Sequence, residues 1–162
     1  MTAQIYVGTY AKYNAGSIAG AWLNLEDYQD KDAFLKACAE LHKDEEDPEL
    51  MFQDFEGFPS NFYSESGIEE ELFDWLALDD NEKEILEAYI AITGIQTATI
   101  DEAMEDFHGV FDSDVDFTQQ LLEDCGEIPK DLPNYVVIDW EATARQIMWD
   151  YSEHNGFYFR NA

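Results

Sequence analysis

This 162-residue chain lacks basic residues: it has 8 Lys and Arg against 37 Asp and Glu, a net charge of −29. Binding nucleic acid through the protein's own surface needs a basic footprint, which this composition does not supply. Cysteine is also scarce: Cys38 and Cys125 are the two cysteines, and two such residues 87 positions apart make neither a disulfide framework nor a metal cluster. No apolar run approaches the roughly 18 residues of a membrane-spanning helix, and the N-terminus shows no signal-peptide pattern. These absences predict a soluble, cytoplasmic protein.

Aromatic residues are plentiful, at 15% of the chain, so the acidic composition is not that of a disordered tail. The charge is spread evenly, with a net of −8 over residues 1–60, −11 over 61–103 and −10 over 104–162. Each third also carries several large apolar residues. The acids are therefore expected to coat a folded body.

Residues 1–61 predict an N-terminal domain with a small antiparallel sheet and a helix. Alternating residues indicate a half-buried strand at Gln4–Tyr13. Trp22–Leu25 and Met51–Phe55 are shorter strand candidates. Asp30 is the expected N-cap of a helix whose apolar residues, Phe34, Cys38 and Leu41, recur at helical spacing.

Residues 62–103 predict a central helical bundle, because three capping boxes each precede an apolar stripe. The boxes are Ser66 with Glu69, Asp79 with Glu82, and Thr99 with Glu102. The third stripe continues into the next domain through Ile100, Met104, Phe107 and Phe111.

Residues 104–162 predict a C-terminal α+β domain. The expected elements are a helix capped by Asp116, a strand at Tyr135–Ile138, a helix at Asp139–Tyr151 and a strand at Phe157–Arg160. The fold class predicted for the whole chain is therefore α+β in three small domains.

Catalytic signatures are missing. The chain has no phosphate-binding glycine loop, no HExxH and no Cys-x-x-Cys, and its three histidines are widely separated in sequence. The sequence therefore predicts a protein that is not an enzyme and that needs no cofactor or metal.

One segment resembles a calcium loop. Asp112, Asp114, Asp116 and Glu123 occupy positions 1, 3, 5 and 12 of an EF-hand, but Phe117 replaces the glycine at position 6. The favoured interpretation is a helix N-terminus whose acids suit the helix dipole. A calcium-binding acidic protein remains the alternative function.

Short acidic clusters recur along the chain with almost no basic residue between them, and they are the expected partner-binding surface. They comprise Asp44, Glu45, Glu46, Asp47, Glu69, Glu70, Glu71, Asp79, Asp80, Glu105, Asp106, Asp112, Asp114, Asp116, Glu123 and Asp124. Duplex DNA carries one charge about every 1.7 Å, so 29 net charges match roughly 49 Å of duplex. A compact domain of this length has a diameter of about 40 Å. The chain thus has enough negative charge to imitate a duplex of its own length.

Long stretches near both ends resemble the ArdA family of antirestriction proteins, which occur on conjugative plasmids, transposons and phage-like elements. The N-terminal stretches are IYVGTYAKYNAGSIAGAWLNLEDY and ELHKDEEDPELMFQDFE, and the C-terminal ones are YVVIDWEATAR and GFYFRN. The resemblance is weakest over residues 60–133. Its acidic antirestriction segment corresponds to the region near Glu102–Asp124.

The resemblance implies an elongated, curved protein of three small domains that forms a homodimer through the C-terminal one. It also implies a mimic of B-form DNA that occupies the DNA-binding cleft of type I restriction–modification enzymes in the bacterial host cell. Besides calcium binding, a domain adapted to a high-salt cell and, more remotely, an enzyme are the remaining alternatives.

Overall fold

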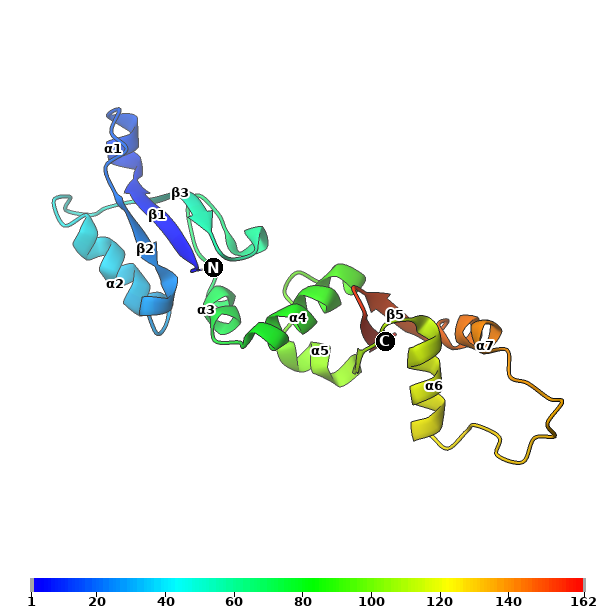
Figure 1. Cartoon of the computed structure of the whole chain (residues 1–162). Coiled ribbons are helices and arrows are strands. Elements are labelled where there is room, and N and C mark those ends of the chain that lie inside the picture. The colour runs from blue at the N-terminus through cyan, green and yellow to red at the C-terminus, as the bar shows by residue number, and fades with distance from the viewer. Residues whose placement is uncertain (1, 162) are drawn as a thin grey trace. The chain divides into compact units, whose positions relative to one another are not determined.

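The structure is a computed structural model that describes residues 2–161. The chain divides into two compact units, one ending at Asp79 and the other beginning at Asp80 (Figure 1). Each unit contains a three-stranded antiparallel sheet with helices, which confirms the α+β class. The division into three domains at residues 61 and 103 and the elongated shape stay predictions.

The first sheet has the strand order β2-β1-β3 and is antiparallel throughout. Its strands, β1 (Gln4–Thr9), β2 (Ala21–Asn24) and β3 (Leu50–Glu56), overlap the three strands that the sequence predicts. β1 ends earlier than expected, because the Thr9 hydroxyl accepts a hydrogen bond from the Lys12 amide and caps the short helix α1 (Tyr10–Asn14). The strand prediction is therefore wrong for its last four residues.

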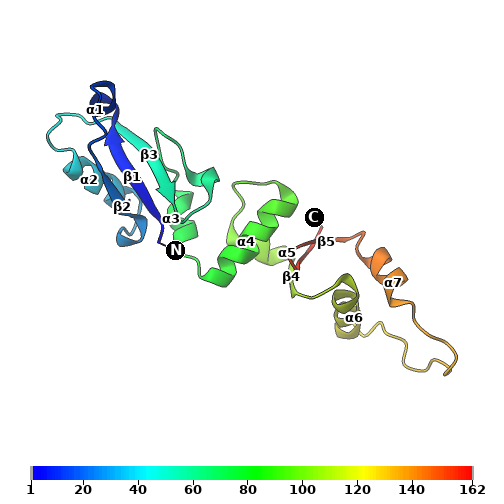
Figure 2. The same ribbon diagram turned by 45° about the horizontal axis from the view of Figure 1, so that its top comes forward.

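Helix α2 (Lys31–Leu41) covers one face of this sheet (Figures 1 and 2). As expected, Asp30 caps it by accepting a hydrogen bond from the Ala33 amide at 2.8 Å. Phe34 is completely buried and stacks on Phe52 of β3, with 6.0 Å between ring centroids. Short 3-10 turns, η1 (Leu25–Asp27) and η2 (Ser60–Phe62), connect the elements of this unit.

Helix α3 (Glu71–Leu76) shares this core, since Leu72 and Phe73 belong to the same buried cluster as Phe34. The helix does not begin with the predicted Ser66 capping box. Ile68 is buried and forms an isolated antiparallel bridge with Tyr63, which holds the preceding chain extended and delays the first turn. The Ser66 prediction is wrong for that reason.

The second sheet has the order β4-β6-β5, with β4 (Phe107–Val110), β5 (Tyr151–His154) and β6 (Phe157–Arg160) all antiparallel. Only the last of these was predicted as a strand. Asn155 and Gly156 connect β5 to β6 with φ of 50° and 86°, the left-handed backbone of a tight hairpin.

Helices α4 (Asp80–Thr93) and α5 (Ile100–Asp106) lie against this sheet, and Tyr89 contacts Phe159 at 5.5 Å between centroids. The Thr99–Glu102 capping box is confirmed, with both reciprocal hydrogen bonds present. The helix predicted to continue through Phe107 instead ends at Asp106, because Phe107 pairs with Phe159 across the sheet.

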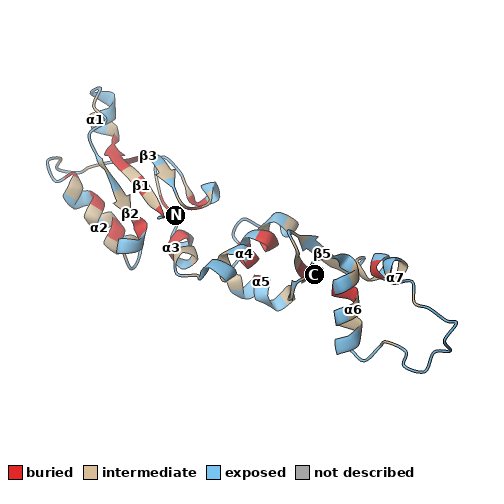
Figure 3. Ribbon diagram, in the orientation of Figure 1, coloured by how far each residue is buried: buried red, intermediate tan, exposed pale blue. Residues whose placement is uncertain are grey.

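Helices α6 (Asp114–Asp124) and α7 (Trp140–Ile147) pack on each other and bury Thr118 and Ala144. The predicted strand Tyr135–Ile138 has no regular secondary structure. Its residues are mostly exposed (Figure 3), since no strand of the described chain lies beside them to pair with. The strand prediction is therefore wrong for the chain by itself.

Candidate acidic interface

None of the 37 carboxylates is buried, although all of them lie within the described residues. All are exposed except Glu45, Glu82 and Asp106, which are half-buried. An ionised carboxylate loses much of its hydration free energy when it enters a protein interior, so apolar cores of this size leave acids outside. The predicted coat of acid on a folded body is confirmed.

The loop after α2 carries the first predicted cluster, and half of it is engaged internally. The Lys12 ammonium lies 2.9 Å from an Asp44 oxygen and 3.5 Å from a Glu45 oxygen. The Thr9 hydroxyl also donates to Glu45 at 2.8 Å. Glu46 and Asp47 are exposed, and within residues 2–161 their side chains accept no hydrogen bond. Glu46 and Asp47 therefore present the open charges of this loop.

His42 joins the same network from the interior, where it is 1% exposed. Its Nε2 lies 3.0 Å from the Val7 carbonyl, which only accepts, and its Nδ1 lies 2.7 Å from the Lys12 ammonium, which only donates. Both contacts are satisfied by the neutral ring with its hydrogen on Nε2.

Ligand atoms of His42, Asp44 and Glu45 lie within 4.8 Å of one another, a spacing compatible with a metal ion. The Lys12 ammonium already contacts all three. The cation of this cluster is thus a lysine, and its role is to tie α1 to the loop after α2.

The Lys12 contact shifts two pKa values in opposite directions. Its hydrogen bond lowers the pKa of Asp44 below the ordinary 3.8 and raises that of Lys12 above 10.5. A carboxyl with a lowered folded pKa adds stability above its unfolded pKa and loses it as the pH falls through the folded value. A lysine with a raised folded pKa adds stability below its unfolded pKa and loses it as the pH rises through the folded value.

We expect Lys12→Met to unfold at a lower temperature than the parent at neutral pH. The difference should shrink as the pH falls below about 3.8 or rises above about 10.5. Thermal melts across pH measure it. Lys43→Met is the matched control, because Lys43 pairs with Glu40 between two well-exposed side chains and should matter little. A Lys12 effect that is equal at every pH would contradict the assignment.

The second cluster begins α3. Glu70 occupies the position before the helix and Glu71 its first turn, with Glu69 just upstream, and all three are exposed. Acids at this end of a helix are favoured by its dipole. The pair Asp79 and Asp80 follows at the start of α4, also exposed.

The remaining predicted acids lie at the ends of α5 and α6. Asp112 is exposed just before α6, and Asp114 and Asp116 lie in its first turn. The cap is Ser113, whose hydroxyl accepts from the Asp116 amide at 3.1 Å, so the predicted cap at Asp116 is wrong by three residues. Glu105 and Asp106 end α5, and Glu123 and Asp124 end α6.

Asp114 has a structural partner. The Tyr158 hydroxyl donates to it at 2.7 Å, and Tyr158 is 2% exposed. Burial, followed by this hydrogen bond, raises the pKa of Tyr158 well above its usual range. The bond ties the first turn of α6 to β6 and sets the position of the neighbouring acids.

The calcium alternative does not survive this geometry. Asp114 and Glu123 lie at opposite ends of one helix, nine residues apart in sequence. At 1.5 Å per residue they are about 14 Å apart along the axis, whereas calcium ligands lie about 2.3–2.6 Å from the ion. The four residues therefore cannot surround one ion.

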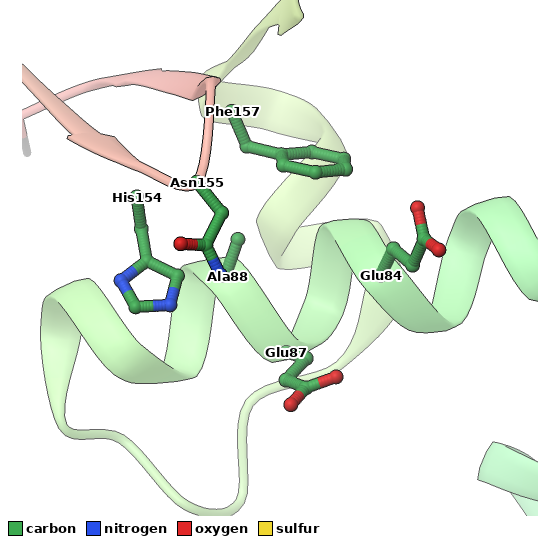
Figure 4. Close-up of a pocket in the computed structure, with 6 residues that line it drawn as sticks. All are labelled: Glu84, Glu87, Ala88, His154, Asn155 and Phe157. Atoms are coloured by element: carbon green, nitrogen blue, oxygen red, sulfur yellow. The ribbon is translucent and has the colours of Figure 1, made fainter.

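An acidic pocket of about 310 Å³ lies beside α4. The sequence did not predict this pocket. Figure 4 shows Glu84 and Glu87 on the helix, below His154 at the end of β5 and Asn155 of the β5–β6 turn. Glu84 and Glu87 are three residues apart and share one face of α4, a spacing visible in the sequence. The position of the β5–β6 turn above these two residues is decided by the tertiary structure and is not visible in the sequence.

No helix among the described residues is long and apolar enough to cross a membrane. No curated protein sequence matches the chain significantly. Residues 5–159 match the profile of one protein family, described as antirestriction protein (ArdA). This match covers nearly the whole chain, including the region where the resemblance is weakest. The chain therefore belongs to the ArdA family of antirestriction proteins, which inhibit restriction without being enzymes.

Proposed function

We propose that this protein imitates B-form DNA and occupies the DNA-binding cleft of type I restriction–modification enzymes inside the host cell. The observation that carries the proposal is the placement of all 37 carboxylates at or near the surface of folded units. DNA-binding proteins make half or more of their hydrogen bonds to phosphate and sugar, which carry no direct sequence information. Carboxylates held near phosphate positions can pair with the Lys and Arg side chains of such a cleft, although the protein supplies no nucleobases.

Two physical consequences follow from the charge. Binding releases counterions from the acidic surface, so the affinity falls steeply as salt rises. The summed field also steers the protein toward a basic cleft and speeds association. A folded scaffold matters as well, because flexible acids would lose more conformational entropy on docking.

A competition assay tests the proposal. A type I enzyme is bound to labelled duplex, and the inhibitor is added at several salt concentrations. We expect displacement at low and moderate salt, with an apparent affinity that falls linearly on logarithmic axes of affinity and salt. The absence of displacement at moderate salt would end the proposal.

We also propose that the protein acts as a homodimer joined through its C-terminal part. Residues 128–149 hold three acids and two bases, a net of −1 in a chain of net −29, so like-charge repulsion between two copies is weak there. The same stretch exposes Tyr135, Val137 and Trp149, at 86%, 85% and 78%. Sedimentation should give twice the chain mass, and Val137→Asp should give the single mass.

A further inference from the structure

Among the described residues of the first unit, 2–79, the helix α2 packs on one face of the first sheet, and Figures 1 and 2 show no helix of this unit on the opposite face. Ile5 and Val7 point from β1 into the buried cluster with Phe34 of α2, so the alternate residues of β1 point the other way. We call this opposite side the outer face. It is formed by Gln4, Tyr6, Trp22, Asn24, Asp54 and Glu56.

An aromatic pair of an exposed Trp22 and a half-buried Tyr6 lies on the outer face. Tyr6 and Trp22 are cross-strand partners, with rings edge to face at 5.7 Å between centroids. Trp22 is 41% exposed, and the Tyr6 hydroxyl donates at 2.6 Å to the carbonyl of Ile18, whose side chain is 73% exposed. The pair has fixed neighbours, so its ring faces are already in place before any partner arrives.

Carboxylates flank this pair on the next strand. Asp54 is the cross-strand partner of Tyr6, and Glu56 that of Gln4, which donates a hydrogen bond to it. The register shifts between Tyr6 and Val7, so β3 carries one extra residue at this point, as in a β-bulge. None of the three strands contains a Lys or Arg, so the outer face offers aromatic rings and acids without a competing cation.

We propose that the outer face binds arginine side chains of the restriction enzyme, with the guanidinium over the Trp22–Tyr6 pair and hydrogen-bonded to Asp54. Guanidinium is planar, pairs with carboxylates and stacks on aromatic faces, whereas the ammonium of lysine acts as a point charge. Phosphate mimicry alone does not explain exposed aromatics, because phosphates offer no ring. This inference rests on the proposed function and adds a discrete contact to a diffuse one.

Two short peptides test the chemistry on the full-length protein. We expect hexa-arginine to bind about 2- to 5-fold more tightly than hexa-lysine, measured by calorimetry at moderate salt. Trp22→Thr, which removes the ring and introduces a β-branched residue that suits a strand, should remove this preference. Asp32→Asn, which removes a charge from α2 on the opposite side of the sheet, should leave it. Equal binding of both peptides, or a preference that survives Trp22→Thr, would overturn the proposal.

The same variants are then compared in the competition assay. Trp22→Thr should weaken inhibition by up to about 30-fold at every salt concentration, while Asp54→Asn should also reduce the salt dependence. Tyr13→Ala, which removes another exposed ring from the same unit, should change neither. If the parent protein displaces DNA, and Trp22→Thr and Asp54→Asn inhibit as well as the parent does, the outer face is not a contact and the proposed function stands. If the parent protein does not displace DNA, the proposed function itself is wrong.

Asp54→Asn covers the case in which Trp22→Thr does not fold. The Asp54 side chain accepts a hydrogen bond from the Phe55 amide, which an asparagine oxygen can also accept. Thermal melts of both variants identify any loss of folding. A change in sedimentation mass with either variant would show that the outer face binds a second copy instead, and would also overturn the proposal.

Discussion

Replacing ten exposed carboxylates by their amides will weaken inhibition by about 30-fold at the least. Each exposed ion pair contributes about 0.2–1 kcal/mol, so ten lost pairs sum to about 2–10 kcal/mol, and 1.4 kcal/mol is tenfold. Any one of them alone should change inhibition by about fivefold at most. The ten are Glu46, Asp47, Glu69, Glu70, Glu71, Asp80, Glu105, Asp112, Asp116 and Glu123. Competition against labelled duplex measures the loss.

A second variant with the same net charge separates position from total charge. Its ten substitutions are at Glu26, Asp27, Asp32, Glu49, Asp74, Glu84, Glu87, Asp101, Glu127 and Asp150, all exposed and outside both the predicted acidic clusters and the proposed dimer contact. It should inhibit more strongly than the first variant. Equal losses would mean that bulk charge matters and the predicted clusters do not. Total loss from one single substitution, with the fold intact, would point to a discrete site instead.

Phe117→Ala should destabilise the second unit by about 3–5 kcal/mol, the usual cost of emptying a buried phenylalanine site. Phe117 is 1% exposed and stacks on Tyr158 at 4.5 Å between centroids, and it also contacts Phe111 and Tyr151. Thermal unfolding followed by circular dichroism measures the change. Because Phe117 anchors α6 to the sheet, loosening that helix should also weaken inhibition.

Phe117→Leu is the matched control, since it keeps an apolar side chain of similar length. It should cost clearly less stability than Phe117→Ala and retain more inhibition. If Phe117→Ala melts as predicted but inhibits normally below its melting temperature, a rigid array of acids is not required.

Local signals in the sequence predicted local structure well. The caps at Asp30 and Thr99 are confirmed because each depends on groups three residues away. The cap at Asp116 is wrong because Ser113 lies upstream and makes the same kind of bond first. The strand β1 was predicted from alternation, which burial of one face imposes.

In the second unit the same reasoning gave wrong predictions, because strands there pair with residues far away in the sequence. Phe107 continues the helical stripe of α5, yet it lies in β4 because Phe159, 52 positions later, offers a partner. The Asn155-Gly156 pair is a strong hairpin signal, which predicts a strand before it as well as after it. The helix predicted over Asp139–Tyr151 is therefore wrong at its end, because α7 ends at Ile147 and Tyr151 begins β5. Tyr135–Ile138 has the composition of a strand, but no strand of residues 2–161 pairs with it.

The sequence by itself determined the α+β class, the acid excess and the family, because composition, short-range capping and long matching segments are properties of the chain in order. It did not determine which acidic side chains have a hydrogen-bond or ion-pair partner within the protein. Asp44, Glu45 and Asp114 look like their neighbours in sequence, and only folding brings Lys12 and Tyr158 to them. The outer face with Tyr6, Trp22 and Asp54 likewise exists only once three separate strands pair, since hydrogen bonds between strands join residues distant in the sequence.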